Sequence, residues 1–298
     1  MLDKVSVIMT CFNHEKYIEE AILSVIHQSY DNWELLIWDD SPGKCTWEII
    51  ERFQKQYPTK IKARHHKENK GIIRNMKFLI NHSNAQYIAV LEWDDYWNNE
   101  YLREKMNLFS DNKVKLVYND LDIVDWCSKV LRTNFLKKRW INKFYKWETF
   151  EMEEVFKSFN IPYFSWSTIM FRKSLLSDIS IEVPGLSPYN IISDYNFFMM
   201  VWVKYGVFGL EEGLTYYRVH NSNLSWNEGV FTLIPELCRL FSYYKTVGFI
   251  SNEQRKYVTT RYLLVLMYET LKKLIKTSVK YSAINFWKYA FLKLKNLF

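Results

Sequence analysis

Short apolar runs alternate with segments of helical periodicity over the first 91 residues, and this alternation restricts the fold more than any other feature of the sequence. The apolar runs are rich in β-branched and aromatic residues, which is typical of buried strands. They cover residues 5–12, 33–38, 61–64 and 87–91. Between them, apolar residues recur at helical spacing, over residues 17–26, 47–53 and 72–80. The alternation predicts an α/β fold with a mostly parallel sheet, flanked by helices and joined by right-handed crossovers.

Polar side chains gather where three of these predicted strands end. The clusters are residues 10–13, Asp39 with Asp40, and residues 92–95. Ligands of parallel α/β sheets bind in the crevice beyond the carboxyl ends of the strands. We therefore expect the three clusters to face one crevice.

The third cluster, in YIAVLEWDDYW, brings together the carboxylates of Glu92, Asp94 and Asp95. Acids after a strand can cap the next helix, but three carboxylates this close repel one another unless a cation is present. Mg²⁺ or Mn²⁺ would relieve the repulsion and bridge the oxygens of a diphosphate leaving group. The first turn, TCFNHEKY, has neither a GxGxxG nor a GxxxxGK[ST] phosphate loop, so a metal is the phosphate counter-charge that we expect.

Composition narrows the class of protein. A chain of 298 residues with 48% hydrophobic residues can bury one large core. The four cysteines, Cys11, Cys45, Cys127 and Cys238, form no close pair, which argues against a zinc knuckle or a disulfide framework. We see no signal-peptide core and no run of eighteen apolar residues. We therefore expect a cytoplasmic protein, soluble or peripheral on a membrane.

The net charge of +7 is unevenly distributed along the chain. Residues 232–298 hold 12 Lys and Arg against 3 Glu, whereas residues 1–231 hold 28 bases against 30 acids. A near-neutral body with a basic, aromatic tail favours a surface anchor over nucleic-acid binding. The tail has helical patterning and could lie in a membrane interface; the alternative is a lid packed on the rest of the protein.

Five motifs in order resemble those of the inverting family 2 glycosyltransferases of the Rossmann-like GT-A fold. They fall between about residues 4 and 225 and read VSVIMTCFNHEKYIEEAILSVIHQSYDNWELLIWDDS, NKGIIRN, YIAVLEWDDYW, SDYNFFMMVWVKYG and LTYYRVHNSNLS. The resemblance implies an enzyme that moves a sugar from a nucleotide-sugar, such as a UDP-sugar, to a glycan or lipid-linked saccharide. Such enzymes make bacterial surface polysaccharide or lipooligosaccharide on the cytoplasmic face of the inner membrane.

The resemblance also assigns roles to individual residues. Asp194 is implied as the catalytic base. Nucleotide-sugar contacts are implied for Thr10, Phe12, Asp40, Arg74, Glu92 and Asp94. Metal ligation is implied for Asp94, Asp95 and His220, which form the DxD cluster with its additional histidine and would hold Mn²⁺ or Mg²⁺. Arg218 is a further candidate for phosphate contact.

Each assignment has a structural alternative. The sequence departs from the family pattern at residues 41–43, which read Ser-Pro-Gly in place of Gly-Ser, in the spacing from Gly71 to Arg74, which is two residues shorter, and at residues 92 and 193. Asp40 can belong to an ordinary turn, Arg74 can be a solvated helix residue, and Asp194 can cap its helix. A lone histidine such as His220 is more often structural. Glu92 stands where Asp is usual, and Ser193 stands where Glu is common.

We expect a catalytic domain over residues 1–231 and a basic helical region over residues 232–298. Within the catalytic domain, residues 1–120 would bind the nucleotide-sugar and residues 121–231 the acceptor. A non-catalytic glycan- or membrane-binding protein on a degenerate GT-A fold is the alternative function. The acids Asp40, Asp94, Asp95 and Asp194 argue against that alternative, because a chain without catalysis should lose carboxylates first. The oligomeric state does not follow from the sequence.

Overall fold

The computed structural model describes residues 3–13, 15–66, 68–136, 165–182, 193–221, 223, 230–248, 250–253, 255–256 and 259–260. The chain divides into two compact units. Residues 1–183 and 187–223 form the first, here called the body, and residues 184–186 and 224–298 form the second, the C-terminal unit. The predicted functional boundary at residue 231 stays a prediction.

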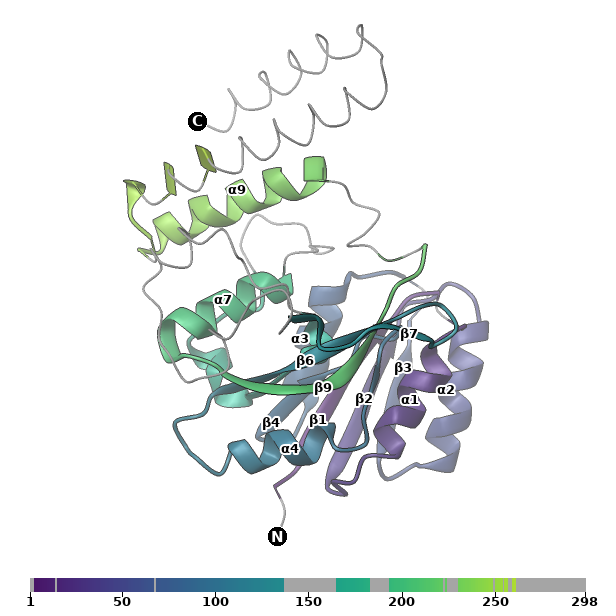
Figure 1. Cartoon of the computed structure of the whole chain (residues 1–298). Helices are drawn as coiled ribbons and strands as arrows, with labels where there is room; N and C mark the ends of the chain where they lie inside the picture. Colours follow the sequence, from purple (N-terminus) through teal and green to yellow (C-terminus); the bar gives the residue numbers. More distant parts are fainter. Residues whose placement is uncertain are drawn as a thin grey trace, which may run out of the picture. The chain divides into compact units, whose positions relative to one another are not determined.

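The described part of the body contains a nine-stranded sheet, in the order β3-β2-β1-β4-β8-β6-β9-β5, with β7 paired to β6 (Figure 1). Its strands are β1 (Val5–Cys11), β2 (Trp33–Asp39), β3 (Ile61–His65), β4 (Tyr87–Val90), β5 (Tyr96–Trp97), β6 (Leu116–Val124), β7 (Val130–Arg132), β8 (Ile169–Arg172) and β9 (Phe208–Arg218). The helices of the body are α1 (Ile18–Ile26), α2 (Cys45–Gln56), α3 (Ile72–His82), α4 (Tyr101–Leu108) and α7 (Ser193–Tyr205), with short 3-10 helices η1 (Trp166–Thr168) and η2 (Lys173–Ser177).

The first half of the sheet is parallel, as the sequence predicted. Strand β1 pairs in parallel with β2 and β4, and β2 pairs in parallel with β3. Strand β1 ends at Cys11, because Asn13 adopts a positive φ of 58° and its amide donates to Ser41 Oγ at 2.7 Å. Strand β2 extends to Asp39, which pairs with Cys11 on one side and His65 on the other.

The second half of the sheet mixes directions, and sequence periodicity did not resolve it. Strand β8 runs antiparallel to β4 and β6, whereas β9 runs parallel to β6. Strands β5 and β7 are only two and three residues long, too short to show a period of two. The sheet is therefore mostly parallel, with an antiparallel insertion that separates the β1–β4 part from β6.

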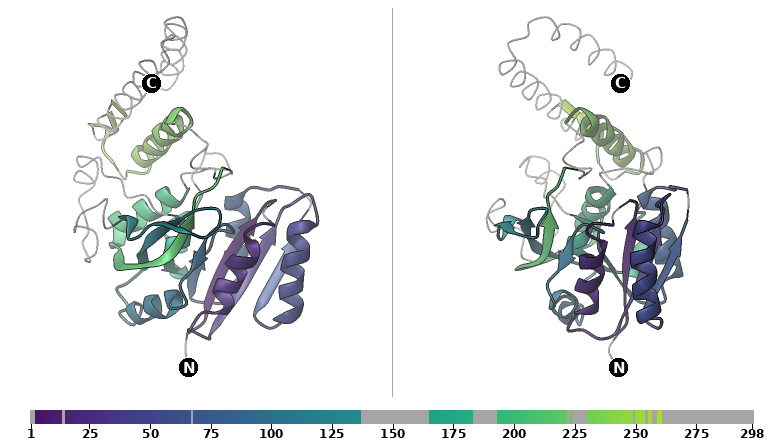
Figure 2. Two further views of the ribbon diagram at one scale, coloured as in Figure 1. Left: turned by 45° about the vertical axis from the view of Figure 1, so that its right-hand side comes forward. Right: turned by 90° about the vertical axis from the view of Figure 1, so that its right-hand side faces the viewer.

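The core lies between the sheet and its helices. Alternate residues of β1, Val5, Val7 and Met9, share one apolar cluster with Ile22 and Val25 of α1, as the period of two along a strand requires. Helices α1 and α2 lie on one face of the parallel strands, and α3 lies on the opposite face (Figure 2). Burying such aliphatic side chains stabilises the fold by about 1.5–3 kcal/mol each.

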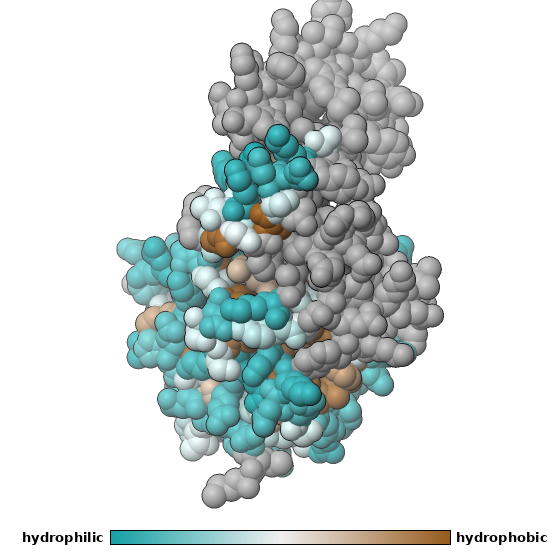
Figure 3. Space-filling view, turned by 90° about the vertical axis from the view of Figure 1, so that its left-hand side faces the viewer, coloured by the Kyte–Doolittle hydropathy of each residue, from teal (hydrophilic) through white to brown (hydrophobic). Residues whose placement is uncertain are grey.

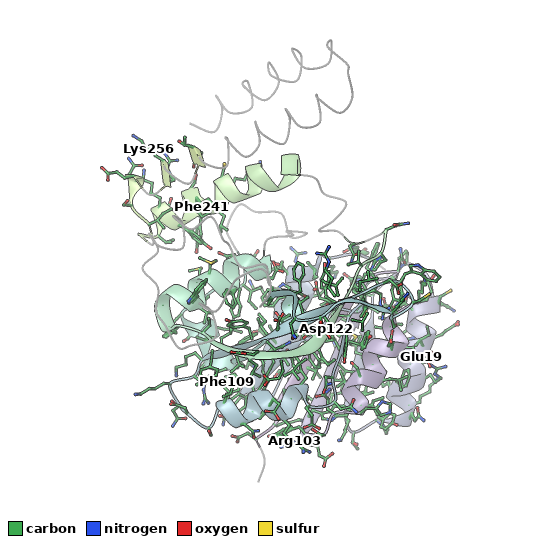
Figure 4. The ribbon with its side chains drawn as sticks, in the orientation of Figure 1. Glu19, Arg103, Phe109, Asp122, Phe241 and Lys256 are labelled. Carbon is green, nitrogen blue, oxygen red and sulfur yellow. The ribbon has the colours of Figure 1, made fainter. Side chains whose placement is uncertain are left out.

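Polar residues also cover the side of the molecule that lies away from α1 and α2 (Figure 1, Figure 3). Figure 3 shows a face on which the described residues are mostly hydrophilic, with small and separated hydrophobic patches. Glu19 on α1 and Arg103 on α4 are at the surface, and the side chains of the body fill the layers around the sheet (Figure 4). The apolar residues of the helices are therefore directed toward the strands.

In the C-terminal unit, helix α9 (Val230–Thr246) buries Leu240, Phe241 and Tyr244. The chain turns away from the helix at Gly248, whose φ of 73° suits a residue without a Cβ and whose amide donates to the carbonyl of Lys245 at 3.0 Å. No helix in the described ranges is both long and apolar enough to cross a membrane. The predicted amphipathic tail beyond residue 260 lies outside the described residues.

Strands β6 and β9 approach closely at one glycine. Gly209 pairs with Tyr118, and a Cβ on Gly209 would lie 2.5 Å from the Cζ and hydroxyl oxygen of that ring. The Tyr118 ring is buried and packs edge-on against Phe198 of α7, with 5.6 Å between ring centroids. The ring therefore has little room to move.

We predict that Gly209→Ala destabilises the body by about 1–3 kcal/mol, the usual cost of overpacking a core. Gly43→Ala is the matched control, because a Cβ at Gly43 would meet no atom within 4 Å. The measurement is urea unfolding followed by tryptophan fluorescence. Equal midpoints for the two variants would contradict the close packing.

Lys105 is a buried lysine in α4. Its Nζ donates to the carbonyl of Thr168 at 2.6 Å and to that of Val117 at 3.3 Å, and it lies 4.2 Å from the centroid of the Tyr101 ring. No carboxylate is among these partners. Burial lowers the pKa of Lys105 well below its ordinary value of 10.5.

The lowered pKa of Lys105 predicts the direction in which stability changes with pH. Between the folded pKa and pH 10.5 the unfolded chain binds the Lys105 proton more readily than the folded chain, so stability falls as pH falls through this window. The stability of the wild type relative to Lys105→Met should therefore rise with pH, by at most about 1.4 kcal/mol per pH unit. Urea unfolding from neutral pH to pH 10.5 measures this, with Lys113→Met at an exposed position as control. A difference that is independent of pH would refute it.

Candidate active site

Three polar clusters meet at the carboxyl ends of the parallel strands. Because β1, β2 and β4 are parallel neighbours, the residues after each strand lie at the same edge of the sheet. The amide of Asp40 donates to the carbonyl of Cys11 at 3.0 Å, and the amide of Leu91 donates to the carbonyl of Ile8 at 3.0 Å. The strand ends are thus joined to each other by backbone hydrogen bonds.

Asp40 is buried and receives three hydrogen bonds. Its Oδ1 accepts from Trp38 Nε1 at 2.6 Å, and its Oδ2 accepts from the amide of Lys70 at 2.7 Å and from Asn75 Nδ2 at 2.6 Å. Each carboxylate oxygen has two lone pairs, so Oδ1 keeps the capacity for one more donor. Asp39, also buried, binds Ser41 and the Nδ1 of His65. Both acids therefore organise the loops at this edge of the sheet.

The carboxylates of residues 92–95 are directed to different partners. Glu92 Oε2 accepts from Ser165 Oγ at 2.6 Å, and Asp95 Oδ1 accepts from the amide of Arg218 at 3.0 Å. Asp94 Oδ2 lies 2.9 Å from His220 Nε2. The three acids thus fan out from one short loop, and each contacts a residue that lies far later in the chain.

Burial leaves part of this negative charge uncompensated. The pKa of Glu92 is raised well above its ordinary value, first by burial and then by the charges of Asp95 and Asp94. The pKa of Asp95 is raised well above its ordinary value by burial and by the charge of Asp94. A cation close to Asp94 would oppose both effects.

Arg218, at the end of β9, connects the acidic loop to two other elements. Its Nε donates to the carbonyl of Asp94 at 2.8 Å, and its other nitrogens donate to the carbonyl of Asp125, to Ser128 Oγ and to Glu20. The side chain is 1% exposed. We expected a phosphate contact for Arg218, but its guanidinium is engaged by the protein, and it positions the acidic loop.

Asp194 lies in the first turn of α7, near the same acids. Its charge contributes to the raised pKa of Glu92, which places the two carboxylates in one electrostatic environment. Ser193 Oγ accepts from Trp166 Nε1 at 3.2 Å, and Trp166 follows Ser165, which binds Glu92. Asp194 is partly exposed. It is therefore accessible to solvent, while the contact of Ser193 with Trp166 holds the start of its helix in place.

The remaining predicted residues lie at the same edge of the sheet, with different exposures. Thr10 is partly exposed at the end of β1, and Phe12, just beyond the strand, is 38% exposed. Arg74 is exposed in the first turn of α3, and its neighbour Asn75 is the residue that contacts Asp40. The side chains of Phe12 and Arg74 are thus accessible to a ligand.

Sequence analysis missed several supporting residues, namely Ser165, Asn223, Asn75, Glu20 and Ser128. Ser165 and Asn223 lie far from residues 92–95 in the sequence, and a Ser or Asn carries no signal of such a distant partner. Asn223 had a local signal, because its Oδ1 accepts from the amide of His220, three residues earlier, at 2.5 Å, and asparagine commonly bonds nearby backbone in turns. Its Nδ2 also reaches Asp94 Oδ2 at 3.3 Å.

The donor set fits a hard divalent cation that also binds a ligand's phosphates. Within the described ranges, no three His, Cys, Asp or Glu residues form a closed metal-binding group. Asp94 Oδ2 and His220 Nε2 are two adjacent donors at the strand edge. Mg²⁺ commonly takes one or two carboxylates together with substrate phosphates and water, so the carboxylate of Asp94 suits it, whereas the imidazole of His220 is more typical of transition-metal sites.

Arg218 and the exposed Arg52 provide a matched comparison, since they pair with neighbouring acids of α1, Glu20 and Glu19. We predict that Arg218→Met destabilises the protein by about 2–4 kcal/mol, because it leaves buried carbonyls without donors. Arg52→Met should cost less than about 1 kcal/mol, as exposed ion pairs do. Urea unfolding of the two variants tests this, and equal losses would contradict the role of Arg218.

Comparison with known proteins finds glycosyltransferases among the relatives of this chain. The chain is 26% identical to "UDP-Glc:alpha-D-GlcNAc-diphosphoundecaprenol beta-1,3-glucosyltransferase WfaP" of Escherichia coli, over 94% of this chain and 98% of that protein. It is 37% identical over 92 residues to "Putative glycosyltransferase EpsE" of Bacillus subtilis, a match that covers 31% of this chain and only 33% of that protein.

Solved structures share the fold. TarS of S. aureus in complex with UDP-GlcNAc has a TM-score of 0.63 at 15% identity, over 87% of this chain and 71% of that chain. The mannosyltransferase PcManGT from Pyrobaculum calidifontis, in complex with GDP-Man and Mn²⁺, has a TM-score of 0.57 at 13% identity, over 99% of this chain and 81% of that chain. These similarities confirm the predicted GT-A fold class.

The model of the family described as "Glycosyl transferase family 2" matches residues 6–180. This range is more than half of the chain, and it includes the strand ends with their acidic clusters and the Ser165 turn that supports Glu92. With the ordered motifs, the fold and the relatives in agreement, the chain belongs to glycosyl transferase family 2.

Proposed function

We propose that this glycosyltransferase is metal-dependent and inverting, and that it moves a sugar from a UDP-sugar to a glycan or lipid-linked saccharide in bacterial surface polysaccharide synthesis. The observation that carries the proposal is the acidic loop at the end of β4. Asp94 lies against His220, and Glu92 shares its electrostatic environment with Asp194 on α7. Donor-holding and proton-accepting groups are thereby brought to one edge of the sheet.

The nucleotide end of the donor fits the ends of β1 and β2. Phe12 offers an exposed aromatic face for a base, and Thr10 adds a partly exposed hydroxyl beside it. Asp40 Oδ1 keeps one lone pair for a ring N–H. Exposed Arg74 in the first turn of α3 supplies a positive charge for the phosphates.

Asp94, Asp95 and His220 would hold the divalent cation, and Asp95 Oδ1 also keeps the loop in place by accepting from the amide of Arg218. The cation, when bound, neutralises the diphosphate and stabilises it as a leaving group. Since the carboxylates of Asp94 and Glu92 would otherwise repel the diphosphate, donor affinity should depend on the cation. The carboxylates of this set suit both Mn²⁺ and Mg²⁺.

Asp194 is the proposed base. It takes the proton of the acceptor hydroxyl while the hydroxyl oxygen attacks C1 of the sugar from the face opposite the nucleotide. The bond between C1 and the phosphate oxygen breaks, and its electron pair leaves with the nucleoside diphosphate. Attack from the opposite face inverts the configuration at C1.

The relatives support the substrate classes. The name of WfaP gives a UDP-glucose donor and a diphosphoundecaprenol-linked acceptor, and the TarS structure contains UDP-GlcNAc. PcManGT was solved with GDP-Man and Mn²⁺, so the nucleotide is part of what must be tested. We propose a peripheral position on the cytoplasmic face of the inner membrane, where a lipid-linked acceptor would be available.

We predict that two substitutions separate the base from the donor site. Asp194→Asn should leave the affinity for UDP and Mn²⁺ nearly intact and lower transfer by about two to four orders of magnitude, the usual contribution of a general base. Asp94→Asn should weaken metal-dependent UDP binding and transfer together, and EDTA should do the same to the wild type. Calorimetry with UDP, followed by transfer assays with the donor found in a nucleotide-sugar screen, measures both.

Asp178→Asn is the matched control, because Asp178 contacts Tyr205 at the opposite end of α7. It should change neither property. Near wild-type transfer by Asp194→Asn would refute the assignment of the base, and UDP affinity unchanged by EDTA would refute the metal. A protein that binds glycans but transfers no sugar from any donor would favour the non-catalytic alternative.

A further inference from the structure

The hairpin that joins β6 to β7 exposes large apolar side chains. Trp126 is 59% exposed, Val130 45% and Leu131 54%. In the part of the chain that the structure describes, only Phe12 and Val247 are other large hydrophobic residues with such exposure. Three of the five therefore lie within six consecutive residues of one hairpin, here called the Trp126 hairpin (residues 125–132).

The turn of this hairpin is held in place by its own hydrogen bonds. Asp125 Oδ1 accepts from the amides of Cys127 at 2.8 Å and Lys129 at 3.0 Å, and the amide of Asp125 donates to the carbonyl of Lys129 at 3.0 Å. Ser128 adopts a φ of 64°, and its hydroxyl donates to Glu20 of α1 at 2.9 Å. The exposure of Trp126 thus follows from a defined turn.

The exposed surface of the hairpin is basic as well as apolar. Lys129 and Arg132 are exposed, and Lys16 Nζ lies 4.7 Å from the centroid of the Trp126 ring. The one carboxylate among residues 125–132 belongs to Asp125, and its Oδ1 is turned to the backbone amides of the turn. The tip of the hairpin therefore carries apolar and cationic side chains together, and it carries no acidic residue of its own.

We propose that the Trp126 hairpin docks the body on an anionic lipid surface. Tryptophan is favoured at the boundary between headgroups and acyl chains, and each lysine or arginine near an anionic membrane adds attraction. Val130 and Leu131 are consecutive residues of β7, so their side chains point to opposite faces of the strand. One of them would enter the apolar layer with Trp126, while the exposed bases of the hairpin contact lipid phosphates.

Other occupants fit the surface less well. Strand β7 has only three residues; Lys129 precedes it and Arg132 is its last residue. A short edge strand with charged side chains opposes the addition of a partner strand. A saccharide could stack on Trp126, but it would not need the exposed Val130 and Leu131 beside it. The combination of a tryptophan, two aliphatic residues and two bases matches a lipid interface.

The hairpin is connected to the active site through one side chain. Arg218 donates to the carbonyl of Asp125 and to Ser128 Oγ in the turn, and also to the carbonyl of Asp94. A docked hairpin would therefore hold the acidic loop at a fixed position relative to the lipid surface. If the proposed lipid-linked acceptor is correct, this contact would bring the site to it; docking itself does not depend on that proposal.

Two exposed cysteines allow a local test in the full chain. Cys127 lies at the tip of the hairpin, and Cys45 can be replaced by Ser so that Cys127 alone is exposed among the cysteines. An environment-sensitive fluorophore on Cys127 should shift to the blue and gain intensity with vesicles of phosphatidylcholine and phosphatidylglycerol, and it should respond far less to phosphatidylcholine alone. The control carries the fluorophore at Thr59→Cys, with Cys45 and Cys127 both replaced by Ser, on an exposed turn beyond α2; it should not respond.

The local readout separates the hairpin from the basic tail. A Cys127 signal unchanged by anionic vesicles would overturn the proposal, whether or not the protein sediments with them. A signal that rises only on self-association, or only with soluble saccharide, would also overturn it.

Substitution of the exposed side chains gives a second test. Combining Trp126→Ser, Lys129→Glu and Arg132→Glu in the unlabelled chain should weaken binding to anionic vesicles by at least about tenfold, and undiminished binding would overturn the proposal. Transfer to a water-soluble acceptor should persist in this variant, because none of the three side chains belongs to the active site. Loss of vesicle binding with intact transfer is thus distinguishable from a failure of the proposed enzymatic function.

Discussion

Holding three neighbouring carboxylates together, with Asp94 and Asp95 buried and Glu92 partly exposed, is the physical requirement on which the rest of the active site depends. Burial and mutual repulsion both oppose ionisation of Glu92 and Asp95, so the loop needs donors from elsewhere in the chain. Strand β9 supplies the amide and guanidinium of Arg218, and the residues after it supply His220. Strand β9, although late in the sequence, is therefore connected to the acidic loop by electrostatic contacts as well as by the sheet. A cation would complete the compensation that these donors begin.

The turn at residues 165–168 carries this arrangement to the start of α7. Its side chains reach Glu92 and Ser193, and its carbonyls are satisfied by buried donors, including Lys105 Nζ and Trp97 Nε1. A backbone turn inside a protein must have its polar groups paired, because each unpaired group is costly. The side-chain nitrogen of Lys105 is thus kept in a buried environment, which lowers its pKa. The turn ties the end of β4 to the start of α7, where Asp194 lies.

The predictions from sequence were most accurate where a residue's position depends on its own strand. The parallel strands and the convergence of Asp40 with the acidic loop followed from the alternation of apolar periods, because parallel strands end at one edge. The positioning role of Arg218 was not predicted, since a sequence gives the charge of an arginine but not the carbonyls around it. Asn75 was not predicted, although its side chain contacts Asp40; the phosphate contact expected of its neighbour Arg74 stays a prediction. Roles that depend on a partner distant in sequence could not be read from local pattern.

The sequence by itself determined the fold class, the family and the residue types gathered at the strand ends, because periodicity and local motif order are properties of neighbouring residues. Only the tertiary structure decided which of those residues touch. It paired Asp94 with His220, buried Arg218 beneath the acidic loop and turned the Trp126 hairpin outward. These outcomes depend on strand order, and β8 lies between β4 and β6 through short antiparallel pairings. The physical reason is that such long-range contacts are selected by the packing and hydrogen-bond needs of the whole body, which no short segment encodes.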